Sequence, residues 1–193
     1  MSGRFSKAIL IAVVMCMLSV MLIAIASGNA SNDDSQINQL IQMSKAGKST
    51  DKIIETARKN GFLINHMKDY DLEGKEIWES FVSNCEAGIP GSVKILAVRR
   101  EWYDESIIGL AIIEYVYADG KYTKVSYELP SGESNESDQC SRLVSYYSEE
   151  HDCMHYFITN SDIDVDSFES EKEFERAVYD DELPLFWSLS YKN

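Results

Sequence analysis

The sequence IIGLAIIEYVYADGKYTKVSYEL, residues 107–129, decides the fold. It holds two runs rich in Ile, Val and Tyr, joined by Asp119-Gly120, a dipeptide typical of a two-residue β-hairpin turn. This turn predicts that Tyr117 lies opposite Tyr122 on the neighbouring strand. The residues expected on the core face of the hairpin are Leu110, Ile112 and Val116. Glu114 interrupts that face, so its carboxylate must lie at a rim or have a partner.

Signals for further helices and strands flank this hairpin. The segments before it predict a short helix from Gln36, a helix from Thr50 to before Gly61, a helix over Glu73–Ala87 and a strand over Val93–Tyr103. The segments after it predict a second hairpin of Ser141–Ser148 with Cys153–Asn160, a capped helix that begins at Ser170, and a strand over Leu185–Tyr191. We therefore predict an α+β fold: an apolar N-terminal helix, then helices packed on one face of an antiparallel meander of about five to six strands.

The N-terminal part of the chain carries a long apolar run, Ala8–Ala26. Its 19 residues hold no charge and follow the basic residues Arg4 and Lys7. A helix of that length rises about 28 Å, which is close to the hydrocarbon thickness of a bilayer. The same layout, with small residues at its end, is typical of a secretory signal. Residues 1–30 are therefore predicted to be a signal peptide or a transmembrane anchor, and both alternatives stay open.

The basic flank of the apolar run predicts the orientation of the chain. Positively charged flanks stay in the cytoplasm, so an uncleaved N-terminus is cytoplasmic and the rest of the chain is extracytoplasmic, either membrane-anchored or secreted. Residues 31–49 are expected to form a spacer and a short helix. Residues 50–193 have the length of one extracytoplasmic α+β domain.

The part of the chain after the leader is strongly acidic. Removal of residues 1–30 takes away Arg4 and Lys7, which leaves 16 basic against 32 acidic side chains. The charge is concentrated in residues 130–193, with 4 basic and 16 acidic side chains. This excess disfavours nucleic acid as a partner and leaves the N-terminal segment as the only predicted contact with a membrane. A protein, a peptide or another envelope ligand is the expected partner, and basic groups suit the last third.

Three cysteines follow the leader: Cys85, Cys140 and Cys153. An odd number leaves at least one thiol without an intramolecular disulfide. In the predicted second hairpin Cys153 lies opposite Ser148, whereas Cys140 lies at the far end, about 25 Å away at roughly 3.3 Å per residue. A disulfide between Cys140 and Cys153 is therefore excluded, because bonded cysteines need Cα atoms within about 7 Å. Any internal disulfide must include Cys85.

Several segments carry a family resemblance: WESFV at 78–82, GIPGSVKI at 88–95, YADGK at 117–121, Cys140 and the strand of Tyr156. Together they resemble an uncharacterised family of exported, often lipid-anchored α+β domains of Gram-positive bacteria. The similarity covers about residues 75–160. It implies an extracytoplasmic domain of unknown function and no catalytic residue. This chain lacks the lipid-attachment cysteine that such domains carry at the end of the leader.

An acidic segment has part of the pattern of a calcium-binding loop. The side chains at the spacing of its oxygen ligands are those of Asp162, Asp164, Asp166 and Glu173. Ser167 stands where the sharp turn of such a loop needs glycine, and Glu169 stands where an apolar residue is expected. We therefore favour a solvated acidic turn. Specific binding would make the folding of residues 160–175 calcium-dependent.

A second pattern, H-x-C-x-H, consists of His151, Cys153 and His155. On a regular strand these three side chains share one face, and they are ligand types that suit zinc or copper. His151 falls in the predicted turn and no fourth ligand is evident, so a packed cysteine and two histidines near a turn are favoured. We predict no metal site, no cofactor and no catalytic residue from the sequence.

Two functions remain from the sequence. The first is a non-enzymatic binding or interaction module at the cell envelope, which uses the sheet face or the acidic last third. The tyrosines that would line a ligand groove, or more simply cover a half-buried sheet, are Tyr115, Tyr117, Tyr122, Tyr127, Tyr146, Tyr147 and Tyr156. The alternative is an envelope hydrolase that uses His151, His155 and nearby carboxylates. Clustering of these groups in one concave pocket would favour the enzyme.

Overall fold

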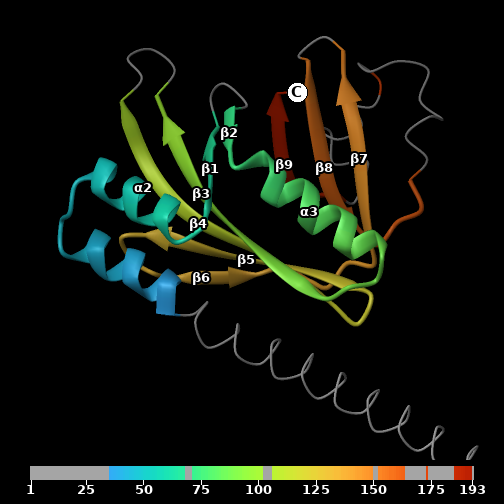
Figure 1. Ribbon diagram of the computed structural model, residues 1–193, viewed down its shortest axis with the longest axis horizontal. Helices are drawn as coiled ribbons and strands as arrows, with labels where there is room; N and C mark the ends of the chain where they lie inside the picture. The colour runs from blue at the N-terminus through green and yellow to red at the C-terminus, as the bar shows by residue number, and fades with distance from the viewer. Residues whose placement is uncertain are drawn as a thin grey trace, which may run out of the picture. The chain divides into compact units, whose positions relative to one another are not determined.

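The computed structural model describes residues 35–67, 71–101, 106–149, 152–163, 173 and 185–192 (Figure 1). The apolar leader and most of the helix predicted from Ser170 lie outside these residues. The chain divides into two compact units, Met1–Leu40 and Ile41–Asn193. The described residues of the first unit, 35–40, are helical. In the second unit, residues 41–45 are helical. None of the helices in the described residues is long and apolar enough to cross a membrane.

The second unit is an α+β structure with two sheets. Its elements before residue 137 are, in chain order, α2 (Thr50–Lys59), β1 (Leu63–His66), β2 (Asp71–Glu73), α3 (Lys75–Glu86), β3 (Gly91–Arg100), β4 (Ile107–Ala118), β5 (Lys121–Leu129) and β6 (Ser134–Glu136). The six strands among them form one sheet in the order β2-β1-β3-β4-β5-β6. The remaining strands, β7 (Arg142–Ser148), β8 (Cys153–Thr159) and β9 (Leu185–Lys192), form a three-stranded sheet in the order β7-β8-β9.

The prediction of one antiparallel meander is therefore correct only at the level of the α+β class. The described strands form two sheets, and β1 runs parallel to β3 with Leu63 beside Ile95. The sequence analysis missed β1 and β2, and it assigned Glu73 to the third helix whereas Glu73 ends β2. Both missed strands are very short, so neither offers enough residues for a period of two to be recognised.

The end of α2 follows the sequence prediction. Ile53, Ile54 and Ala57 form its buried stripe. Gly61 adopts a left-handed conformation with φ of 77°, and the Phe62 N–H donates to the Ala57 carbonyl at 3.0 Å. This bond closes the helix in a Schellman-type end, which requires a residue that tolerates positive φ.

The central hairpin is confirmed. Tyr117 pairs with Tyr122, and their ring centroids are 4.7 Å apart. Asp119 and Gly120 have φ of 52° and 74°, as a turn that matches the twist of both strands requires. The second predicted hairpin is also confirmed, because Ser148 pairs with Cys153.

Gly120 provides a direct test of this turn. We expect Gly120→Ala to destabilise the protein by roughly 1 kcal/mol, because its left-handed conformation is strained for a side chain and nothing lies within 4 Å of a new Cβ atom. Gly91→Ala is the matched control, since it also has open space but no positive φ. Urea unfolding should therefore separate the two variants, and equal midpoints would contradict the turn conformation.

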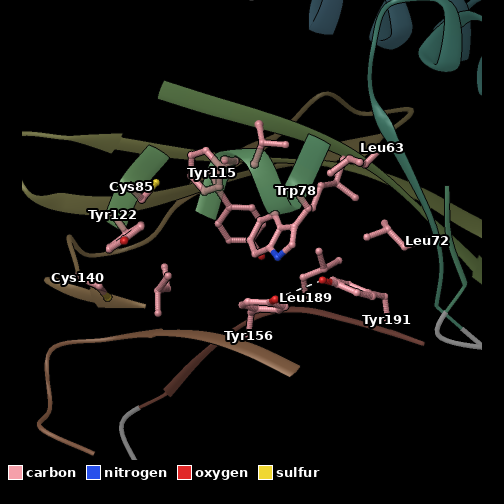
Figure 2. Packing of buried hydrophobic residues seen from close by; sticks show 14 residues of the cluster. Leu63, Leu72, Trp78, Cys85, Tyr115, Tyr122, Cys140, Tyr156, Leu189 and Tyr191 are labelled. Carbon is pink, nitrogen blue, oxygen red and sulfur yellow. Dashed lines mark hydrogen bonds between the residues drawn. The ribbon is translucent and has the colours of Figure 1, made fainter. Parts of the chain in front are cut away.

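Helix α3 lies between the two sheets. Trp78 on α3 is fully buried. The centroid of its indole lies 5.5 Å from the ring centroid of Tyr115 on β4 and 5.3 Å from that of Tyr156 on β8. Figure 2 shows Tyr115 on one side of Trp78 and Tyr156, Leu189 and Tyr191 on the other. The prediction that helices cover only one face of a single sheet is therefore wrong for α3, which joins two sheets through one aromatic core.

Both faces of the hairpin β4–β5 carry buried residues, whereas the sequence pattern predicted only one core face. Leu110 and Ile112 are buried as expected, but Val116 is only half-buried. The larger cluster lies on the opposite face, where Tyr115 and Tyr122 pack with Trp78. A sheet covered on both sides loses the alternation of apolar and polar residues from which one core face can be chosen.

Glu114 has a neighbour of opposite charge, as the sequence analysis required. Lys94 lies directly across from it on β3 and is itself almost fully buried. The Lys94 ammonium also lies 5.4 Å from the centroid of the Phe62 ring. A cross-strand pair of opposite charges stabilises the sheet and lets the carboxylate occupy a face of apolar residues.

An ionic cluster joins α2 to β1 and β2. The Arg58 guanidinium donates to both carboxylate oxygens of Glu73 at 2.7 and 2.9 Å, and His66 Nε2 lies 3.1 Å from Glu73 Oε1. The hydrogen bond from Arg58, and to a lesser extent that from His66, lowers the pKa of Glu73 below its ordinary value of 4.5. The folded protein therefore binds this proton less readily than the unfolded chain.

This shift predicts a loss of stability in acid. A carboxylate with a lowered pKa stabilises the fold above its unfolded pKa, and the contribution disappears as the pH falls through its folded pKa. We expect Glu73→Gln to reduce the unfolding free energy by up to about 1 kcal/mol near pH 7, because the pair is partly exposed. Unfolding curves of the wild type and the variant should converge below pH 4.5. A difference that stays constant with pH would contradict this role.

Candidate functional site

A cysteine, a histidine and a serine form a line of hydrogen bonds on the three-stranded sheet. Cys153 and His155 lie two residues apart on β8 and therefore share one face, and Ser190 of β9 pairs with His155. Cys153 Sγ is 2.9 Å from His155 Nε2, and His155 Nδ1 is 2.7 Å from Ser190 Oγ. We refer to these three residues as the thiol–imidazole line.

The surroundings hold the imidazole in place. The His155 ring stacks against Tyr146 and Phe157, at centroid distances of 6.0 and 6.3 Å and interplanar angles of 26° and 14°. The exposed fractions of Cys153, His155 and Ser190 are 0%, 7% and 4%. Buried polar groups are retained where they are hydrogen-bonded, and here each of the three has a partner.

The serine hydroxyl can donate or accept, whereas a thiol sulfur is only a weak acceptor. We therefore assign the His155 tautomer in which Nδ1–H donates to Ser190 Oγ and Nε2 accepts the proton of the Cys153 thiol. A thiol, a base and a group that orients the base is the arrangement by which proteins activate a cysteine nucleophile. The site therefore contains a thiol, a base and a group that orients the base, and all three side chains are buried.

Sequence reasoning found part of this line. It placed Cys153 and His155 on one face of a strand, as observed. It did not find Ser190, because the pairing of β8 with β9 joins segments that are far apart in the chain. The alternation in residues 185–191 predicted a strand but held no information on its neighbour.

The two metal hypotheses receive no support from the part of the chain that the structure describes. There, no group of three or more His, Cys, Asp or Glu side chains could hold a metal ion. His151 lies outside the described residues, as do Asp164 and Asp166. Asp162 is described and forms an ion pair with Arg142 across the second hairpin.

The other two described cysteines lie in the aromatic core beside Tyr122. Cys140 pairs with Tyr122 through its backbone, and Cys85 belongs to the same buried cluster as Tyr122. Burial raises the pKa of Cys85 to about 11, and burial together with Asp138 raises the pKa of Cys140. All three described cysteines are free thiols, and Cys140 and Cys153 lie at opposite ends of the second hairpin.

Three of the seven tyrosines considered for a ligand groove belong to the core instead. Tyr115, Tyr122 and Tyr156 are buried around Trp78 and Cys85. Tyr147 is exposed, and its hydroxyl donates to Asp152 at 2.6 Å. The simpler alternative, that these tyrosines cover a sheet, therefore describes the three buried rings.

A β-bulge exposes an apolar residue at one end of the six-stranded sheet. Arg99 pairs with Gly109 but Arg100 pairs with Ile107, so Ile108 is an extra residue between them. Its exposed fraction is 63%. At the same end Met67 follows β1, donates its N–H to the Val98 carbonyl at 3.4 Å and is 49% exposed. We call Met67 and Ile108 the apolar end of this sheet.

The chain was compared with known proteins at the level of families, single sequences and structures. No family model, no curated protein and no solved structure matches it.

Proposed function

We propose that the chain is an exported protein of the bacterial cell envelope, membrane-anchored or secreted, that binds a protein, peptide or envelope ligand without catalysing a reaction. The apolar run Ala8–Ala26 with its basic flank supports export. The resemblance to exported domains of Gram-positive bacteria agrees with this location. The acidic balance of the chain favours a partner other than nucleic acid.

The observation that carries the binding proposal is the exposed apolar end. The other large apolar residues of β4 are buried or half-buried, whereas Ile108 at the bulge is 63% exposed. Bulges re-aim side chains and are common beside functional sites. Met67 lies two strands away, at about 10 Å given a spacing of roughly 4.8 Å between strands. Met67 and Ile108 therefore expose apolar surface at the same end of the sheet.

The sequence that joins β3 to β4 at this end adds to the argument. It contains Trp102 and Tyr103, whose residue types dominate the energetics of protein interfaces.

The hydrolase remains the second proposal. It requires His151 and His155 to work with nearby carboxylates. The partners of the His155 ring include a thiol, a hydroxyl and two aromatic rings, and His151 lies outside the described residues.

The proposed surface is tested by paired charge substitutions in the full chain. We expect Met67→Asp with Ile108→Asp to reduce retention on immobilised envelope fractions, namely purified cell-wall sacculi and detergent-extracted envelope proteins, by about tenfold or more. Ile89→Asp is the matched control, since Ile89 is 51% exposed but lies between α3 and β3. Equal retention of the double variant and the control would overturn the assignment of this surface.

A further inference from the structure

The thiol–imidazole line differs from the other buried cysteines of the chain. Cys85 and Cys140 lie among apolar and aromatic side chains, where burial keeps their thiols protonated. Cys153 instead has an imidazole nitrogen 2.9 Å from its sulfur. Because the thiolate is the reactive form of cysteine, a base at hydrogen-bond distance distinguishes Cys153 chemically from Cys85 and Cys140.

We propose that Cys153 is a site of reversible oxidation by small hydroperoxides, with His155 as the base that takes the thiol proton and Ser190 as the residue that positions His155. This activity goes beyond the proposed binding function and does not depend on it.

The burial of the line defines the class of reactant. Cys153 has no exposed surface, so a peptide or an ester cannot bring a carbonyl to the sulfur without a large rearrangement. Hydrogen peroxide is nearly as small as water and carries no charge. Cys153 is also the first residue of β8, directly after the hairpin connection, so its sulfur lies at the end of a strand. These two facts favour a small neutral oxidant.

The reaction balances with groups already present. His155 Nε2 accepts the Cys153 proton, and the thiolate attacks one oxygen of the hydroperoxide. The S–O bond forms as the O–O bond breaks, and the leaving oxygen takes the proton back from His155 and departs as water. The sulfur loses two electrons and becomes a sulfenic acid, while the peroxide gains them. Cys140 lies at the opposite end of the second hairpin, so the reductant is an external low-molecular-weight thiol. One equivalent displaces water from the sulfenic sulfur and forms a mixed disulfide, and a second equivalent releases the Cys153 thiol and leaves as the disulfide of the small thiol.

The test compares the cysteines within one molecule. The folded full chain is treated with hydrogen peroxide at neutral pH, the peroxide is removed with catalase, and the chain is then unfolded in the presence of dimedone and mapped by peptide mass spectrometry. We expect an adduct at Cys153 that forms at least tenfold faster than any adduct at Cys85 or Cys140. Labelling of Cys85 and Cys140 also reports folding, because both thiols become reactive when the core opens.

Two variants separate reactivity from structure. His155→Gln should slow the reaction of Cys153 at neutral pH by about tenfold, because the variant has no base to take the thiol proton. Ser190→Ala should slow the oxidation of Cys153 less than His155→Gln does. If labelling of Cys85 shows that His155→Gln has opened the core, Ser190→Ala is the variant that tests the proposal. The proposal is overturned if native Cys153 stays unlabelled while the unfolded chain is labelled. It is equally overturned if neither variant changes the rate while Cys85 and Cys140 stay protected.

Discussion

Replacement of Trp78 by alanine is expected to destabilise the protein by about 3–5 kcal/mol, because it removes the largest side chain between the two sheets. The Trp78 indole has no exposed surface and contacts aromatic rings of both β4 and β8. A cavity there would weaken the packing of both sheets at once. Urea unfolding followed by far-UV circular dichroism measures the change.

Ile77→Ala on the same helix is the control for this prediction. Ile77 precedes Trp78 and is 40% exposed, so its truncation should cost less than about 1 kcal/mol. A loss for Trp78→Ala no larger than that of Ile77→Ala would show that α3 does not join the two sheets.

The second large effect is expected at the centre of β4. Ile112→Ala should destabilise the protein by about 2–5 kcal/mol, because Ile112 is fully buried on the face of the hairpin opposite Tyr115. Ile108→Ala is a matched control on the same strand, with the same residue type and an exposed fraction of 63%. Its effect should stay within about 0.5 kcal/mol.

Together the two positions test whether both faces of this sheet are core. If Ile112→Ala cost as little as Ile108→Ala, the face away from Trp78 would carry no packing energy. If Ile108→Ala cost as much as Ile112→Ala, the bulge would not turn Ile108 outward, and the proposed binding surface would be wrong too.

Local signals were sufficient for the central hairpin. Asp119 and Gly120 fixed the turn and hence the pairing of Tyr117 with Tyr122, because a two-residue loop leaves one register. The end of α2 at Gly61 is local in the same sense. In both cases the deciding interactions join residues that are close in sequence.

Non-local features could not be read in the same way. Nothing near Trp78 in the sequence indicates that its indole contacts Tyr156, which follows it by 78 positions in the chain numbering. The sequence likewise does not indicate that β1 pairs in parallel with β3, because β2 and α3 lie between these two strands in the chain. The division into two sheets is decided by such contacts, and so the single predicted meander was wrong.

The candidate site shows the same limit. The spacing of Cys153 and His155 was enough to place both on one face of a strand. Their mutual hydrogen bond and the contact with Ser190 depend on rotamers and on the pairing of β8 with β9, which the spacing does not contain. The exposed position of Ile108 likewise depends on a register shift between β3 and β4.

The central claim is that the folded part of this chain works outside the cytoplasmic membrane. Protease shaving of intact bacterial cells that produce the full chain with a C-terminal epitope tests it directly. The account predicts that the epitope is removed from intact cells, or is already present in the medium, while a cytoplasmic marker stays protected. An epitope that resists the protease until the cells are lysed would contradict it.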